Sequence, residues 1–244
     1  MNAIRGARER ARAEVTAAIK DEARRQLAEE GAARLSLRAV ARELGMVSSA
    51  LYRYFPSRDE LLTALIIDAY DAIGSAAERA LATVDRERPV DRWREVCRAA
   101  RQWALARPHE YALIYGSPVP GYFAPEVTIA PASRVGLALV VVVRDARAAG
   151  LLREPADTAV PRAVAEDADR FTARLGLDLP APVTAALVAA WAELFGLIGF
   201  EVFGQFNRLV EAREEFFDHA VTRLAEAVGL TDGDRKPTEP PPVL

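Results

Sequence analysis

Residues 34–62 carry two short helical patterns of apolar positions, separated by a glycine. The first pattern has the i, i+3, i+4, i+7 spacing of one helix face, with Leu37, Val40, Ala41 and Leu44. Ser36 stands before it, where a hydroxyl can accept an unpaired backbone N–H and cap a helix. Gly45 follows, and glycine ends a helix in the left-handed conformation at little cost. The pattern therefore predicts a short capped helix that ends in a glycine turn.

A second short helix is expected from Ser48, its N-cap, to about Tyr54. Pro56 cannot continue this helix, because proline lacks a backbone N–H and clashes with the preceding turn. Three apolar residues at intervals of four are expected to face a small core: Val47, Leu51 and Phe55. The side chains left facing outward or sideways are Ser48, Ser49, Ala50, Tyr52, Arg53 and Tyr54.

A longer helix is predicted from Ser57 to about Ala82, because Ser57 and Glu60 have the spacing of a capping box. The order of these elements favours a helix-turn-helix: a helix, a glycine turn, a second helix, a proline stop and a capped helix. The same order also occurs in plain pairs of packed helices, so the pattern alone leaves both interpretations open. Small residues at the start of the second helix would let its backbone approach base edges closely, which favours DNA binding.

The stretch LSLRAVARELGMVSSALYRYFPSRDELL resembles the N-terminal DNA-binding domain of the TetR family of transcriptional regulators, over roughly Ala11–Ile73. This resemblance implies that the second short helix reads bases in the major groove. Arg58 matches the usual lysine that grips the DNA backbone, and arginine there allows a bidentate phosphate contact. The DNA-binding residues expected on this basis are Ser36, Arg38, Ser48, Ser49, Ala50, Tyr52, Arg53, Tyr54 and Arg58.

The rest of the chain predicts helices throughout, so the expected fold class is all-α. The β-branched run Leu139–Val143 is flanked by helical sequence and is interpreted as a buried helix segment. We expect a three-helix head with a helix-turn-helix on a larger helical bundle for ligand binding and dimerisation. The predicted parts are a flexible segment 1–10, a DNA-binding domain 11–56, a ligand-binding and dimerisation domain 57–230, and a proline-rich disordered tail 231–244.

The stretch RPHEYALIYGSPVPGY resembles the C-terminal domain of a TetR subgroup called WHG-type. Its prolines and glycines predict a kinked, non-helical path after Tyr115. The resemblance implies a small-molecule pocket, and an apolar lining with a few polar anchors is the usual composition of one. The candidates are Trp103, His109, Tyr111, Tyr115, Tyr122, Phe123, Trp191 and Phe195, although aromatic residues at helical spacing also form plain cores.

The helix expected over residues 183–206 is apolar nearly all round, so both of its sides must be covered. One side can face the chain's own core, and the other requires a partner. We therefore expect a homodimer in which this helix and the last helix, residues 211–228, meet their symmetry mates. The interface candidates are Leu194, Ile198, Phe217, Ala220 and Leu224, with ordinary core helices as the alternative.

The net charge of −3 does not suggest nucleic acid, but its distribution does. Residues 1–58 carry twelve Lys and Arg against seven Asp and Glu, and the remainder carries 20 against 28. The two parts therefore have charges of +5 and −8, which fits a DNA-binding head on an acidic body. A single cysteine, Cys97, excludes an internal disulfide. We find no run of about 18 apolar residues, which predicts a soluble, cytoplasmic protein without a membrane partner.

No catalytic or metal-binding motif is evident, so neither an enzyme nor a cofactor is expected. The two histidines, His109 and His219, fall on separate predicted helices. The sequence predicts a homodimeric repressor that leaves a palindromic operator when a small molecule binds. Its expected partners are double-stranded DNA, a second copy of the chain and a small-molecule effector. The competing interpretation is a helical ligand-binding or dimerisation protein whose basic head is incidental.

Overall fold

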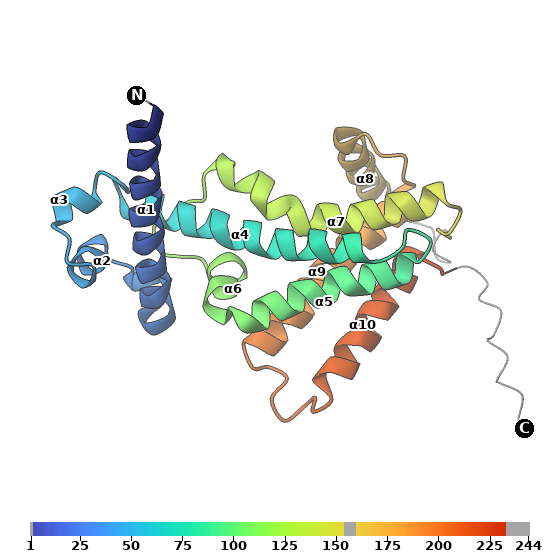
Figure 1. The fold of residues 1–244 in the computed structure, drawn as a ribbon. Coiled ribbons are helices and arrows are strands. Elements are labelled where there is room, and N and C mark those ends of the chain that lie inside the picture. Colours follow the sequence, from blue (N-terminus) through green and yellow to red (C-terminus); the bar gives the residue numbers. More distant parts are fainter. Residues whose placement is uncertain (1, 154–159, 233–244) are drawn as a thin grey trace, which may run out of the picture. The chain divides into compact units, whose positions relative to one another are not determined.

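The computed structural model describes residues 2–153 and 160–232, and within these ranges the chain is helical, without a named strand (Figure 1). An isolated bridge joins Leu152 to Leu230. Residues 233–244 of the predicted tail lie outside the described residues. The elements are α1 (Asn2–Glu30), η1 (Ala32–Arg34), α2 (Leu37–Glu43), α3 (Ser48–Leu51), α4 (Arg58–Thr83), α5 (Pro89–Ala106), α6 (Pro108–Tyr115), η2 (Glu126–Thr128), α7 (Ile129–Ala148), α8 (Arg162–Leu175), α9 (Ala181–Val202) and α10 (Arg213–Val228).

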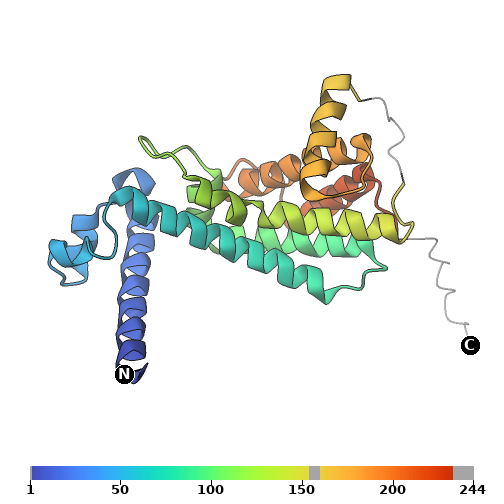
Figure 2. The ribbon, with the colours of Figure 1, turned by 90° about the horizontal axis from the view of Figure 1, so that it is seen from above.

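Two compact units divide the chain: Met1–Ala72 with Ala104–Ala132, and Ile73–Trp103 with Ser133–Leu244. Helices α4, α5 and α7 each contribute residues to both units. Residues 2–10, expected to be flexible, already belong to α1 in the structure. The long course of α1 is visible in Figure 2.

The first unit is built on the core that the apolar pattern predicts. Most of its buried members come from α1, α2, α3 and α4, and they include Ile19, Val40, Leu51 and Leu62. Residues from α6 and the following loop also pack against this core, among them Leu113, Val119 and Tyr122. The Tyr122 and Thr63 hydroxyls are hydrogen-bonded at 2.8 Å, and Tyr70 donates to the Ile114 carbonyl at 3.3 Å. The unit thus combines the three-helix head with the chain segment around α6.

The local signals of the helix-turn-helix are confirmed at three positions. The Ser36 hydroxyl accepts the Ala39 N–H at 3.4 Å, and the Ser57 hydroxyl accepts the Glu60 N–H at 3.1 Å. Gly45 has φ +64°, the left-handed conformation that its place in the turn requires.

Two expectations around α3 are wrong. Ser48 is not the N-cap, because the helix begins at this residue and Val47 is the cap, without a capping side chain. Val47 also does not face the core, since its side chain is 70% exposed. Its backbone is extended, with φ −69° and ψ 136°, so the helical i, i+4 register that continues to Leu51 and Phe55 does not include it.

The second unit packs α9 against both α8 and α10. The β-branched run of α7 is helical, as predicted, and Val140, Val142 and Val143 are buried. Helix α4 approaches α7 closely at Gly74, where an added Cβ would lie 2.6 Å from the Arg134 Cβ. Glycine at this position therefore permits the close approach of the two helices.

Ion pairs hold α5 to α9 and α10 within the same unit. Arg101 donates two hydrogen bonds of 2.7 Å to Glu201, and the two side chains are 13% and 6% exposed. The Arg101 guanidinium also lies over the Phe217 ring, 5.2 Å from its centre. Arg98 donates to Asp218 on α10 in the same bidentate manner. These contacts attach α5 to the inner sides of the last two helices.

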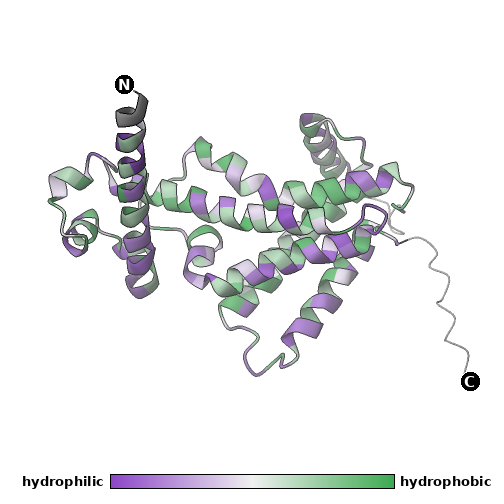
Figure 3. Ribbon diagram, viewed as in Figure 1, coloured by the Kyte–Doolittle hydropathy of each residue, from purple (hydrophilic) through white to green (hydrophobic). Residues whose placement is uncertain are grey.

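Two segments, Glu126–Ala148 and Ala181–Val202, are long and apolar enough to cross a membrane by length and composition. The expectation that no such run exists was therefore wrong. Core helices of globular proteins pass the same test, and Figure 3 shows that the apolar colouring extends over several neighbouring helices of this unit. The two segments are thus weak evidence for a membrane.

Candidate nucleic-acid interface

Five of the predicted DNA-binding side chains are exposed on α2, on α3 or directly after α3, and we refer to them as the α2–α3 surface. They are Arg38, Ser48, Ser49, Tyr52 and Arg53. The remaining predicted residues are half-buried: Ser36, Ala50, Tyr54 and Arg58. The α2–α3 surface offers hydroxyls and two guanidinium groups, which are the groups that bind base edges and phosphates.

The opposite side of α3 fixes this surface in place. Leu51 and Phe55 are buried in the core of the first unit. The Leu51 carbonyl accepts the N–H groups of Tyr54 and Phe55 at 2.8 and 3.1 Å, so the chain stays tightly wound beyond the helix. Because the anchored side is apolar and the exposed side polar, α3 presents its polar side chains on a rigid support.

Arg12 is a cation beside α3 that the sequence gave no reason to single out. Its guanidinium lies 5.0 Å from the centre of the Tyr54 ring and donates to the Arg53 carbonyl at 3.3 Å. A cation over an aromatic face is favourable. Arg12 lies 42 residues before Tyr54 in the sequence, so no local pattern could reveal the contact. It brings α1 to the edge of the α2–α3 surface.

Arg58 has a structural role in addition to the predicted phosphate contact. It donates to the backbone carbonyls of Ala32, Ala33 and Leu35 at distances of 2.9 to 3.2 Å. Its Nη1 lies 3.7 Å from the Asp59 carboxylate. The guanidinium therefore closes the connection between α1 and α2, and its contact with DNA stays a prediction.

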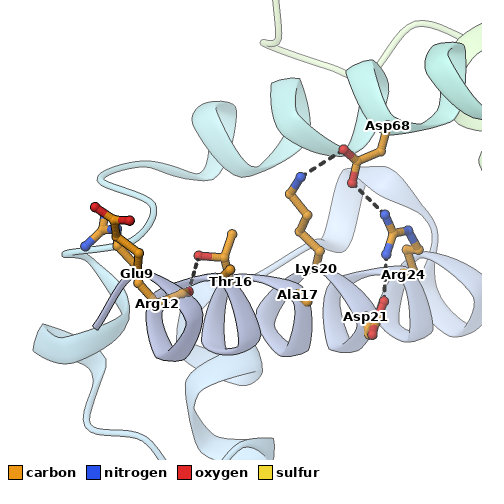
Figure 4. Close-up of a pocket in the computed structure, with 9 residues that line it drawn as sticks. Glu9, Arg12, Thr16, Ala17, Lys20, Asp21, Arg24 and Asp68 are labelled. Atoms are coloured by element: carbon orange, nitrogen blue, oxygen red, sulfur yellow. Dashed lines mark hydrogen bonds and ion pairs between the residues drawn. The ribbon is translucent and has the colours of Figure 1, made fainter. Parts of the chain in front are cut away.

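A groove of about 510 Å³ runs along α1 and α4 in the first unit (Figure 4). Asp68 accepts from both Lys20, at 2.8 Å, and Arg24, at 2.6 Å. Arg24 also pairs with Asp21 at 2.7 Å and lies 3.5 Å from Glu110 of α6. Lys20 and Arg24 thus both already face carboxylates. The charges of the groove join α1, α4 and α6.

The predicted ligand residues fall into both units. In the first, Tyr111 is buried, Tyr115 and Tyr122 are half-buried, and His109 and Phe123 are exposed. In the second, Trp103 is buried, whereas Trp191 and Phe195 form an edge-to-face ring pair with centres 5.9 Å apart. The assignment of these eight residues to one pocket stays a prediction.

Tyr70 of α4 joins the tyrosines of α6, and no pattern in the sequence indicates this contact. Its ring meets that of Tyr115 edge-on at 5.9 Å, and the Tyr111 and Tyr115 rings lie 5.2 Å apart. Burial raises the pKa of all three phenols. At neutral pH these hydroxyls are therefore uncharged, and can both donate and accept hydrogen bonds.

Most of the predicted interface residues are covered within the single chain, and their contact with a second copy stays a prediction. Four of them are buried inside the single chain: Leu194, Ile198, Phe217 and Leu224. Three exposed apolar side chains of α9 lie elsewhere: Val188, Trp191 and Phe200 are 47, 40 and 55% exposed. At 3.6 residues per turn, Val188 and Phe200 project away from the buried stripe, whereas Trp191 lies on its flank near Gly136 of α7. We refer to Val188 and Phe200 as the α9 outer face. Because α9 is apolar all round, its sequence could not show which stripe faces the chain's own core.

Comparisons with known proteins decide the family. Residues 19–65 match the family described as bacterial regulatory proteins, tetR family, and residues 93–224 match the tetracyclin repressor-like C-terminal domain. An HTH-type transcriptional regulator of Mycobacterium tuberculosis (strain ATCC 25618 / H37Rv) is 41% identical over 231 residues, which cover 91% of this chain and 95% of that protein. The chain belongs to the TetR family of transcriptional regulators.

Solved structures agree with this TetR-family assignment. The crystal structure of a protein described as regulatory, SCO4313, is 35% identical, with a TM-score of 0.71, and the match covers 89% of this chain and 98% of that one. A Rhodococcus sp. RHA1 protein with 23% identity and a TM-score of 0.64, covering 88% of this chain and 95% of its own, shares the fold. This TetR-family chain is thus a DNA-binding transcriptional regulator with a helix-turn-helix, and not an enzyme.

Proposed function

We propose that this TetR-family regulator is a homodimeric repressor, released from a palindromic operator when a small molecule binds its C-terminal domain. The α9 outer face is the observation that carries the proposal. Large apolar side chains exposed on the side of a helix away from its core are unfavourable in water, and such patches mark protein interfaces. A second copy of the chain covers them in a four-helix arrangement of two α9 and two α10 helices.

The α2–α3 surface supplies the contact with DNA in this proposal. Each α3 enters a major groove, where Ser48, Ser49 and Arg53 reach base edges. A two-fold dimer places two such helices about 34–36 Å apart, on successive turns of a palindrome. Reading by both heads gives specificity that one four-residue helix does not supply alone.

Ligand control acts through α4 in this proposal, because α4 is one continuous helix that begins in the head. A ligand changes DNA binding only if it binds one arrangement of the two heads more tightly than the other. The aromatic residues predicted for the pocket provide the contacts. The regulator works in the cytoplasm, where its operator is found.

The test begins with duplexes selected from a random library, followed by fluorescence anisotropy at several salt concentrations. We expect tight binding to selected palindromes, with an affinity that falls steeply as salt rises. Arg53→Ala should relax the preference at individual base pairs, whereas the control Arg79→Ala, an exposed arginine of α4, should not. Equal affinity for selected and random duplexes would contradict the proposal and favour the ligand-binding or dimerisation protein without sequence-specific reading.

Release by ligand needs a separate measurement. Small aromatic compounds are screened by thermal shift, and each stabilising compound is added to the protein–operator complex. We expect at least one to lower operator affinity while raising the melting temperature. If every stabilising compound leaves operator affinity unchanged, the ligand-controlled part of the proposal is wrong.

A further inference from the structure

Val47 is an exposed aliphatic side chain next to the α2–α3 surface. It is 70% exposed, whereas the other aliphatic residues of α2 and α3 are buried or half-buried. Ser48 and Ser49 follow it directly, and both are exposed. An isopropyl group thus stands in water beside hydroxyls that can bind DNA.

Within the described residues, no core packing and no helix cap depends on the Val47 side chain. Its backbone carbonyl accepts the N–H groups of Ala50 and Leu51 at 2.9 and 3.4 Å, which any residue could do. The side chain does not belong to the core of the first unit. A serine, threonine or aspartate here would cap α3, and valine cannot. Valine at this position therefore costs a cap and exposes apolar surface, which suggests a contact outside the chain.

The neighbouring residues indicate which contact this is. Ser48, Ser49 and Arg53 are suited to the polar base edges of the major groove, and thymine is the DNA base that presents a methyl group there. We propose that Val47 packs against the C5-methyl group of a thymine in each half-site, and so determines part of the operator sequence. The inference rests on the proposed reading of DNA by α3.

The experiment replaces each thymine of the selected operator in turn by deoxyuridine, which removes the methyl group and keeps every hydrogen-bonding group. For the native protein we expect one position per half-site at which affinity falls about fourfold, the effect of one apolar contact of methyl size. Val47→Ala should bind the normal operator more weakly by a similar factor and should lose its sensitivity to deoxyuridine at that position. This loss of sensitivity in the double-mutant cycle identifies the contacting pair.

Val47→Ser separates the DNA contact from folding, because serine can supply the missing cap of α3. We expect its melting temperature to equal or exceed that of the native protein, and its sensitivity to the methyl group to disappear. Val164→Ala, which changes an exposed valine on α8, should behave as native.

Two failures can be told apart. Suppose that the native protein binds the operator tightly, but that its Val47 variants respond to deoxyuridine in the same way as the native protein. The inference about Val47 is then wrong, and the proposed function stands. If the native protein does not prefer its selected sequence to random duplex, the proposed function fails, and this inference fails with it.

Discussion

The α2–α3 surface and the α9 outer face are both exposed, but they differ in chemistry. The first consists of hydroxyls, guanidinium groups and one tyrosine around the single aliphatic residue Val47. The second is formed by Val188 and Phe200. A polar surface of this kind is stable in water and can exchange water for base edges and phosphates, whereas the apolar face gains most when it is covered.

This difference separates two ways in which a helix can serve recognition. Helix α3 has four residues and is held by its buried side, so a small rigid support carries the specific contacts. Helix α9 has 22 residues, with buried and exposed apolar stripes, so its two sides serve the chain's own core and a partner.

A charge on the α9 outer face should have the largest effect. Phe200→Glu places a carboxylate where we expect a desolvated interface, and an unpaired buried charge costs about 3–5 kcal/mol. The variant should be monomeric by light scattering and should bind the operator at least about 100-fold more weakly. Val164→Glu on α8 is the matched control and should remain dimeric. A dimeric Phe200→Glu protein with native DNA affinity would contradict the proposed role of the α9 outer face as the dimer interface.

A substitution on the inner side of α9 should change the stability of the fold rather than dimerisation. Arg101→Ala leaves the buried Glu201 carboxylate without its guanidinium partner, so unfolding free energy should fall by about 3–5 kcal/mol in urea titrations. Arg162→Ala, which removes the exposed pair with Glu166, is the control and should change stability little. An equally small effect at Arg101 would mean that this pair does not hold α5 to α9.

Arg58 distinguishes support of the α2–α3 surface from direct contact with DNA. Arg58→Ala should lower unfolding free energy by about 1–3 kcal/mol, because three backbone carbonyls lose a charged donor. Arg58→Lys keeps the charge, but an ammonium group cannot reproduce the forked hydrogen bonds of the guanidinium to the three carbonyls. If Arg58 acts mainly on DNA, lysine should restore the salt dependence of operator binding; if it acts mainly as support, lysine should leave most of the stability loss in place.

Acid should weaken the contact between α5 and α10 when it protonates Asp218. Hydrogen bonding from Arg98 lowers the pKa of Asp218, with the charges of Arg98, Arg94 and Arg101 acting in the same direction and burial opposing them. A carboxyl whose pKa is lower in the folded state stabilises the fold above the unfolded pKa of about 3.9, and this contribution disappears as pH falls through the folded pKa. Asp218→Asn should therefore show a flatter loss of stability below about pH 4 than the native protein. Parallel acid titrations of the two proteins would count against the contact.

Signals between near neighbours in sequence were sufficient for the helix-turn-helix. Ser36, Gly45 and Ser57 were assigned correctly because caps and turns depend on residues within one helical turn. Val47 was assigned to the core because a period of four was extended one residue beyond the start of α3. The i, i+4 register of a helix does not extend to the residue that precedes its first turn.

Contacts between distant residues were not predictable. Tyr122 and Thr63 are 59 positions apart, and nothing in either stretch shows that they meet. Leu194 and Phe200 belong to one apolar helix, and only the packed structure shows that the first is buried and the second exposed. The predicted interface residues therefore lie mostly on the sides of α9 and α10 that face the chain's own core, and their place in an interface stays a prediction.

The most direct test of the whole account is the number of chains bound to one operator. Light scattering or native mass spectrometry of the purified complex should find two chains on a duplex with both half-sites, and the α9 variant Phe200→Glu should lose this complex. Affinity for a duplex with a single half-site should be far weaker. A single chain that binds one half-site as tightly as the full palindrome would contradict the account.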